Sequence, residues 1–130
     1  MSQPRRQPVA IVIEPNPDLA ATVAQCLATR GFIVSCATTH AGAAELALAQ
    51  WRVDFLVAAV PAPGEDRHGA YLSEAAKENP GMGIVIMLAD PYELAKDAPS
   101  SAVHLVKPFS VAELDKAIDR ATIFAAGTGA

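Results

Sequence analysis

Several residue types that mark common classes of protein are scarce in this chain. Its 130 residues include two cysteines, Cys26 and Cys36, which are too few for a disulfide framework. Ten Lys and Arg residues against 14 acidic ones leave a net charge of −4, which argues against binding of nucleic acid through phosphate contacts. No apolar run approaches the roughly 18 residues of a membrane span, and no signal-peptide pattern opens the chain. We therefore expect a soluble cytoplasmic protein without membrane or nucleic-acid partners.

Patterns that hold a metal or a cofactor are also missing. No glycine-rich loop of the kind that cradles phosphate follows an apolar run. His40 and His68 have no partners at the spacing of zinc ligands. The sequence predicts that the protein binds no cofactor.

The chain does contain a series of short apolar runs that show no helical period. The run 53–60 is the most prominent, because Pro61, Pro63 and Gly64 stop it at once. Such a run is typical of a strand that is buried on both faces in the middle of a parallel sheet. The predicted strands cover residues 9–13, 32–36, 53–60, 84–88 and 102–106.

Helical patterns separate these strands. Asp18 opens the first helix, and Arg30 with Gly31 closes it. Ser110 and Glu113 form a capping box at the start of the last helix. The other predicted helices cover residues 41–50 and 69–78, and residues 92–97 allow only one or two turns.

Strands that alternate with helices predict a single doubly wound, three-layer α/β domain. The expected sheet is flavodoxin-like, with five parallel strands in the order 2-1-3-4-5. The domain is predicted to span residues 8–124, between a disordered leader (1–7) and a disordered Gly/Ala-rich tail (125–130). In such sheets, sites lie at the carboxyl ends of the central strands. The residues that converge there are Glu14, Pro15, Ala59, Ala89 and Lys107.

The motif Lys107-Pro108-Phe109-Ser110, followed by an amphipathic helix, resembles the end of a two-component response-regulator receiver domain of the CheY-like type. The resemblance covers residues 9–120, and it implies that the Lys107–Pro108 bond is cis. It also implies where the family's functional residues fall. The two acidic residues fall on Glu14 and Pro15, the phosphoacceptor aspartate on Ala59, the Thr or Ser on Ala89, the lysine on Lys107 and the aromatic switch residue on His104.

These positions have lost most of the chemistry that a receiver needs. Phosphoryl transfer to a carboxylate requires that nucleophile, a divalent ion on hard oxygen ligands, and donors that stabilise the moving charge. Ala59 removes the nucleophile, Pro15 removes a ligand and Ala89 removes the hydroxyl group. Glu14 alone makes a poor Mg²⁺ site. We expect a pseudo-receiver that is not an enzyme, is not phosphorylated at this pocket and does not bind Mg²⁺ there.

Some residues near the site have more than one interpretation. Lys107 either clamps an anion or forms a partly buried salt bridge with Glu14, and the salt bridge is favoured because an unpaired ammonium is costly to bury. His104 either senses pH or fills the aromatic slot as a half-buried side chain, which is the favoured interpretation. Residues 65–68 either recognise a ligand or metal or form a solvated, mobile loop, and the loop is favoured.

The segment 90–101 is shorter than in the receivers that the chain resembles. The fourth helix of the fold is therefore predicted to be short or irregular. In that family the fourth helix, the fifth strand and the fifth helix form a face that commonly dimerises or binds output proteins. The predicted interface residues are Tyr92, Leu94, Leu105 and Leu114.

The favoured function is that of a single-domain pseudo-receiver, a phosphorylation-independent protein–protein interaction or signalling adaptor module. Its partner would be a signalling protein, such as a histidine kinase or an output protein, or a second copy of the chain. One alternative is a domain that binds an anion or small ligand through Lys107 and the loop 64–69. Another is a residual phosphotransfer acceptor at Asp66 or Asp90.

Overall fold

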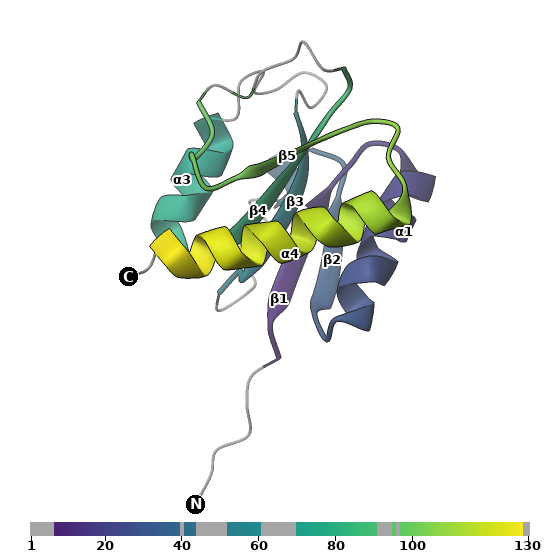
Figure 1. The fold of residues 1–130 in the computed structure, drawn as a ribbon. Coiled ribbons are helices and arrows are strands. Elements are labelled where there is room, and N and C mark those ends of the chain that lie inside the picture. The colour runs from purple at the N-terminus through teal and green to yellow at the C-terminus, as the bar shows by residue number, and fades with distance from the viewer. Residues whose placement is uncertain are drawn as a thin grey trace, which may run out of the picture.

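One parallel sheet organises the protein. A computed structural model describes residues 7–39, 41–43, 52–60, 70–90, 95 and 97–128. Within these ranges, five strands pair in the order β2-β1-β3-β4-β5, and helices lie on both faces of the sheet (Figure 1). The predicted doubly wound fold and its strand order are confirmed.

The strands match the apolar runs, with ends that move by one or two residues. β1, β3 and β4 are buried along their whole length, as expected for central strands that are covered on both faces. The edge strands β2 and β5 are partly exposed. The bounds are β1 Val9–Ile13, β2 Ile33–Ala37, β3 Phe55–Val60, β4 Gly83–Leu88 and β5 Val103–Val106.

Two helices cover one face of the sheet. α1 (Pro17–Thr29) packs on β1 and β2, and α4 (Val111–Thr128) packs on β4 and β5. Side chains at alternate strand positions fill the space beneath them, because successive residues of a strand point to opposite faces. This core includes Val12, Val57, Met87, Leu27 and Ile118.

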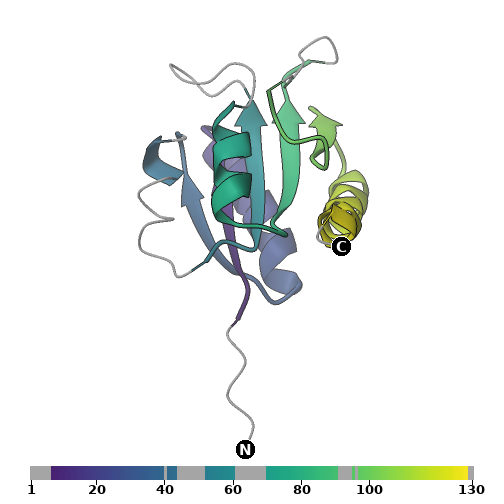
Figure 2. The same cartoon turned by 90° about the vertical axis from the view of Figure 1, so that its left-hand side faces the viewer.

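The opposite face carries α3 (Ala70–Glu78), and Figure 2 shows α3 and α4 on different sides of the sheet. Leu72 of α3 is fully buried there with the other alternate set of strand residues, which includes Ile13, Ala58 and Ile86. Ala43, in a helical turn at residues 41–43, also belongs to this core.

A glycine and a phenylalanine fit together at the start of β4. Gly83 is the register partner of Phe55 in β3. A Cβ atom on Gly83 would lie 2.5 Å from Cε2 of Phe55, which is closer than carbon atoms approach. The ring of Phe55 also meets Phe32 edge-on, at a centroid distance of 5.7 Å. The missing side chain at position 83 therefore gives the Phe55 ring its place in the core.

Both long helices begin at side chains that cap them. The Asn16 side chain accepts hydrogen bonds from the backbone N–H groups of Asp18 and Leu19, so α1 begins at Pro17, one residue before the predicted start. At α4, the Ser110 N–H donates to the Glu113 carboxylate and the Glu113 N–H donates to the Ser110 hydroxyl. The predicted capping box is confirmed.

The predicted domain end at residue 124 is wrong. α4 continues to Thr128, and Ala125 is buried, so residues 125–128 are not a disordered tail. Alanine is the strongest helix former, and the buried Ala125 follows Ala121 by one turn, which extends the same apolar stripe.

Other predictions lie outside the described residues. These are the disordered leader up to Arg6, most of the helix 41–50, the loop 61–69, and the side chains of Tyr92 and Leu94. The predicted short or irregular fourth helix falls mostly on residues 91–94 and 96, which also lie outside the described residues. Among the helices described, none is long and apolar enough to cross a membrane.

Candidate functional site

Four of the five predicted site residues, Glu14, Ala59, Ala89 and Lys107, fall on one face of the sheet at its carboxyl edge by the alternation of side chains along the strands. Glu14 follows β1 and Lys107 follows β5, and each continues the alternation of the side chains beneath α1 and α4. Ala59, near the end of β3, belongs to the same set. The strands thus bring Glu14, Ala59 and Lys107 to the switch point that the sheet order defines.

A direct ion pair occupies this point. The ammonium Nζ of Lys107 lies 2.6 Å from the carboxylate Oε1 of Glu14. The Glu14 side chain is 1 % exposed and that of Lys107 is 28 % exposed. The predicted, partly buried salt bridge is confirmed, and it supplies the buried carboxylate with the counter-charge that it needs.

Backbone hydrogen bonds hold both partners in place. The Glu14 N–H donates to the Ala37 carbonyl at 3.0 Å, and the Lys107 N–H donates to the Leu88 carbonyl at 2.8 Å. These bonds continue the strand pairing for one step beyond β1 and β5. The Lys107–Pro108 peptide bond is cis, as the resemblance implied.

The second oxygen of Glu14 is also engaged. Its Oε2 accepts a hydrogen bond from the Asn16 N–H at 3.0 Å. Asn16 in turn caps α1, so one carboxylate connects the end of β1, the start of α1 and Lys107. Both Glu14 oxygens have partners inside the protein, which makes this carboxylate a poor ligand for an incoming cation.

The acceptor position carries no reactive group. Ala59 is 3 % exposed and ends in a methyl group, and its register partner is Met87 of β4. Pro15 and Ala89 are both exposed at the edge of the sheet and carry no side-chain oxygen. None of these three side chains offers a nucleophile or a metal ligand.

Within the described part of the chain, Glu14 does not belong to a cluster of carboxylates. Asp90 is exposed just after β4, and Asp66 lies outside the described residues. Among the residues that the structure describes, no group of three or more His, Cys, Asp or Glu side chains lies close enough together to hold a metal ion.

Two predictions about neighbouring residues are wrong. His104 is exposed and does not fill a half-buried slot, because β5 is an edge strand and residue 104 points to the face of the sheet away from α4. Leu114 is fully buried on the side of α4 that packs against the sheet, so it cannot form part of an exposed interface. Leu105 packs against the same core and is only half-buried.

The thiol groups provide no alternative nucleophile near neutral pH. Burial raises the pKa of Cys26 above its ordinary value of 9.0, and the nearby Asp115 carboxylate raises it further. Burial also raises the pKa of the Cys36 thiol. Both groups therefore remain protonated at neutral pH, when the thiol is a weak nucleophile.

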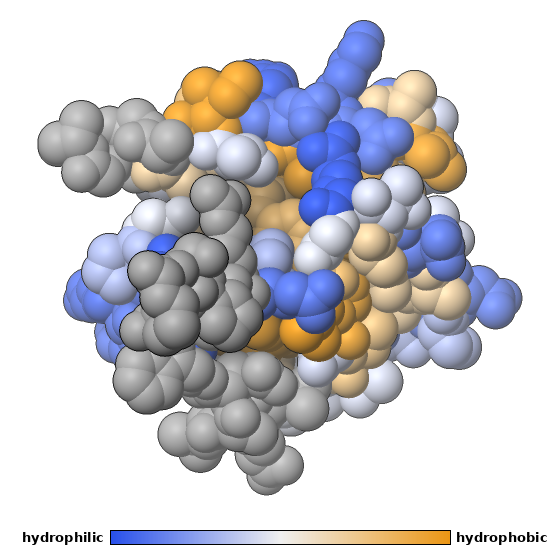
Figure 3. Space-filling view, turned by 90° about the horizontal axis from the view of Figure 1, so that it is seen from below, coloured by the Kyte–Doolittle hydropathy of each residue, from blue (hydrophilic) through white to orange (hydrophobic). Residues whose placement is uncertain are grey.

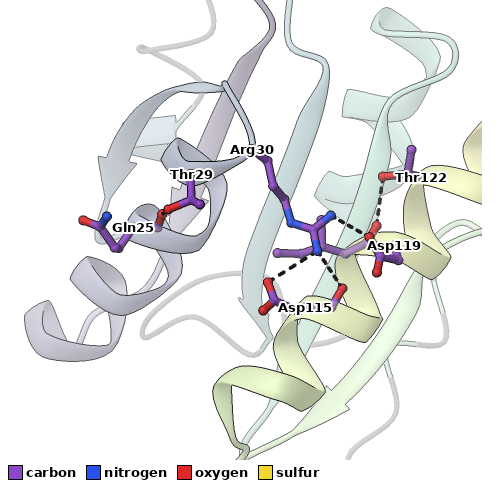
Figure 4. A network of polar contacts seen from close by, with 7 residues as sticks. Gln25, Thr29, Arg30, Asp115, Asp119 and Thr122 are labelled. Atoms are coloured by element: carbon purple, nitrogen blue, oxygen red, sulfur yellow. Dashed lines mark hydrogen bonds and ion pairs between the residues drawn. The ribbon is translucent and has the colours of Figure 1, made fainter.

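The sequence analysis missed an ion-pair network on the side of α4 that faces α1. Arg30, at the end of α1, lies between Asp115 and Asp119 of α4 (Figure 4). Its Nη1 is 2.6 Å from Oδ1 of Asp119, and its Nη2 is 3.4 Å from Oδ1 of Asp115 and 3.1 Å from the Asp115 carbonyl oxygen. The hydrogen bond to Asp119 raises the pKa of Arg30. The spacing of the two aspartates, four residues apart on one helix face, was the available signal.

Comparison with solved structures identifies the class of fold. No protein-family model matches the chain, and no curated protein sequence matches it. Solved structures that resemble it include response-regulator receiver domains, some of them CheY-like. The fold is therefore that of a CheY-like receiver domain.

Three bacterial structures illustrate this likeness. A response regulator receiver protein from Sinorhizobium medicae WSM419 aligns with a TM-score of 0.79 at 20% identity, over 92% of this chain and 98% of its own. The signal receiver domain of an HD domain-containing protein from Pseudomonas fluorescens Pf-5 has a TM-score of 0.73 at 18% identity, over 98% of this chain and 96% of its own. The chemotaxis response regulator CheY4 of Vibrio cholerae has a TM-score of 0.71 at 18% identity, over 89% of this chain and 99% of its own.

Proposed function

We propose that the protein is a pseudo-receiver, a receiver-fold module that takes part in cytoplasmic signalling through protein–protein contacts and without phosphorylation of its switch point. Its partner would be a signalling protein, such as a histidine kinase or an output protein. The receiver fold supports the signalling context. The chemistry at the carboxyl edge of the sheet supports independence from phosphate.

One observation carries this proposal. Where a phosphorylatable receiver needs a free carboxylate and a lysine that can turn to the phosphoryl group, this chain has Ala59 and a Glu14–Lys107 pair. The nucleophile is missing, and the lysine of the site is already neutralised. A phosphoryl group would therefore find neither an attacking oxygen at position 59 nor an unpaired ammonium at position 107.

The pairing of Lys107 also weakens the ligand-binding alternative. An anion at this point would have to displace the Glu14 carboxylate, which is 1 % exposed and would be left without its counter-charge. The loop 64–69, which that alternative also needs, lies outside the described residues. We therefore favour the interaction module.

The test is treatment of the purified protein with acetyl phosphate and Mg²⁺, followed by intact-mass spectrometry under conditions that preserve acyl phosphates. We expect no added phosphoryl group. A stable phosphoryl adduct that disappears in Glu14→Ala would contradict the proposal. An adduct that is lost only in Asp66→Asn or Asp90→Asn would support the residual phosphotransfer alternative instead.

A second measurement addresses the adaptor role. The protein, immobilised with and without acetyl phosphate, would be used to capture partners from the cytoplasm of its own cells. We expect the same partners in both cases. A partner that binds only after treatment with the phosphodonor would contradict phosphorylation independence.

A further inference from the structure

The strand β2 lies at one edge of the sheet and turns a row of backbone groups outward. The Ile33 N–H and the Ala37 carbonyl bond to residues that flank β1. Because backbone direction alternates along a strand, Ser35 also turns its backbone groups toward β1, whereas Val34 and Cys36 turn theirs away from it. Among the residues that the structure describes, these outward N–H and carbonyl groups have no partner.

β2 has none of the features that usually protect an exposed edge. Natural sheets protect their edge strands with lysine, proline, a bulge or a very short strand. Residues 33–37 include no charged residue and no proline, and they pair with β1 without a bulge. By contrast, β5 at the other edge has four residues and is followed at once by Lys107 and Pro108. Of the two edges, that of β2 is the more open to a further strand.

Apolar side chains are exposed on this strand. Seen from the end at which the strands begin, apolar surface lies near the middle of the face and hydrophilic residues border it (Figure 3). Ile33 is the first residue of β2 and is 47% exposed. Cys36, near the other end of β2, is exposed as well. A strand added beside β2 would cover part of both side chains.

The helix α1, which packs over β2, carries small residues on the side toward this edge. Cys26 and Arg30 lie on the side of α1 that faces α4, because the Asp115 carboxylate acts on both. The opposite side of the helix carries Ala21, Ala24 and Ala28. Their methyl groups leave room for another strand beside β2.

β2 is complementary to itself in the antiparallel orientation. With a two-fold axis at Ser35, Val34 of one copy lies opposite Cys36 of the other, and the two residues can exchange N–H···O bonds in both directions. Ile33 then lies opposite Ala37, and Ser35 lies opposite Ser35. Apolar side chains thus meet apolar ones. The one polar side chain of β2 meets its own copy, where the two hydroxyl groups can hydrogen-bond.

The neighbouring registers match less well. An axis at Val34 would place Ser35 opposite Ile33. An axis at Cys36 would place Val34 opposite Thr38. Each of these registers sets a polar side chain against an apolar one, so the side-chain pattern selects the axis at Ser35.

We propose that two copies of this chain associate through β2, which pairs with β2 of the other copy in the antiparallel direction about a two-fold axis at Ser35. The proposal goes beyond the function proposed above and does not depend on it. A strand of five residues is about 17 Å long. A contact of this length buries well below the roughly 800 Å² per partner of a standard interface. The dimer is therefore weak, and it depends little on salt because β2 carries no charge.

Proline substitution tests the backbone pairing. Sedimentation velocity up to about 1 mM protein, the limit of weak specific association, would measure the monomer–dimer equilibrium. Cys36→Pro removes an outward N–H and no bond to β1, so β2 can keep its place in the sheet. We expect it to weaken dimerisation about tenfold, because the axis makes the loss occur twice.

The matched control is His104→Pro on β5. The Lys107 N–H bonds to the Leu88 carbonyl, so by the same alternation the His104 N–H points outward at the other edge. This variant leaves the dimer unchanged. Far-UV circular dichroism confirms that each variant is folded. If Cys36→Pro is not, Ser35→Lys takes its place, since it sets two ammonium groups opposite each other, with Ser35→Thr as its control.

Cysteine cross-linking tests the register. In a Cys26→Ala/Cys36→Ala background, Ser35→Cys places two thiol groups opposite each other at a Cα separation of about 4.5 Å, within the range of a disulfide. We expect a mild oxidant to link the two copies. Ile33→Cys in the same background is the control. Although residue 33 is 47% exposed, its two copies would lie about 13 Å apart along the strands and should not be linked.

Three results would overturn the proposal. One is a wild-type protein that stays monomeric up to about 1 mM. Another is a dimer that Cys36→Pro and His104→Pro weaken equally, because the contact would then lie elsewhere. The third is Ile33→Cys forming the disulfide as readily as Ser35→Cys, because the link would then report random collision.

Discussion

The Lys107 ammonium reaches the Glu14 carboxylate across the carboxyl edge of the sheet, with Nζ 2.6 Å from Oε1. The two residues follow β5 and β1, which β3 and β4 separate in the sheet. The pair therefore spans the switch point from side to side, on the face of the sheet that also carries the methyl group of Ala59.

Removing the Lys107 ammonium while Glu14 stays in place should destabilise the folded protein. We expect Lys107→Met to lower the free energy of unfolding by about 3 kcal/mol, because Glu14 would remain buried without its counter-charge. The double variant Glu14→Gln/Lys107→Met should recover most of this loss, because a neutral amide needs no counter-charge and its oxygen can still accept from the Asn16 N–H. Urea denaturation measures both values. Lys77→Met, at an exposed lysine, serves as the control, and a loss of equal size there would contradict the role of the buried pair.

Returning the missing carboxylates should restore phosphate chemistry. We expect Pro15→Asp/Ala59→Asp to form an Mg²⁺-dependent adduct with acetyl phosphate, because two further carboxylates beside Glu14 supply oxygen ligands and a nucleophile. Intact-mass spectrometry detects the adduct. The buried aspartate should also lower the free energy of unfolding by about 1–3 kcal/mol. Ala112→Asp, on the exposed face of α4, should remain unmodified, and equal labelling of that control would show that the adduct is nonspecific.

The Arg30 network should contribute modestly to stability. We expect Arg30→Ala to lower the free energy of unfolding by about 1 kcal/mol, since the aspartates it contacts are largely exposed. High salt should reduce this difference, because mobile ions screen exposed pairs. Arg30→Lys keeps the charge but loses the geometry that lets one guanidinium contact both aspartates. Its free energy of unfolding should therefore lie between those of the wild-type protein and Arg30→Ala. Thermal unfolding at low and high salt measures the effect, and a difference that does not change with salt would argue for a packing role instead.

Cys26 should make stability fall at alkaline pH. Burial raises its pKa in the folded protein above the ordinary value of 9.0, so the unfolded chain loses the thiol proton first as pH rises. The stabilising contribution is complete below pH 9.0 and is lost as pH rises toward the folded pKa. Cys26→Ala should flatten this part of the profile. Denaturation midpoints between neutral pH and the alkaline range measure it, and a slope that persists unchanged in Cys26→Ala would assign the effect to other groups.

The sheet could be predicted because its central strands are visible in the sequence as short, wholly apolar runs. Runs such as 9–13 and 84–88 are apolar at every position, which is typical of strands covered on both faces. The predicted order is one of the two common ones for a doubly wound sheet, and it was chosen because it places the most apolar strands in the middle. The Glu14–Lys107 pair could be predicted as well. Both residues follow the carboxyl ends of parallel strands, which lie at the same edge of the sheet, and an ammonium group that is buried there needs a counter-charge.

Side-chain direction at the edges of the domain could not be predicted in this way. Leu114 and His104 were assigned from their positions along the chain, whereas their exposure depends on how α4 rotates over β4 and on β5 being the edge strand. Arg30 was interpreted only as the cation at the end of a helix. Its two aspartates come from a helix far along the chain, and only the packing of α1 beside α4 brings them together.

The contact between Gly83 and Phe55 limits how this chain can change over evolutionary time. A side chain at position 83 fits only if the residue at position 55 is smaller than phenylalanine. An aromatic ring at position 55 fits only if position 83 is glycine. The two positions should therefore vary together in related sequences. A chimera that takes one strand from this chain and its neighbour from another receiver would have to carry both residues or neither.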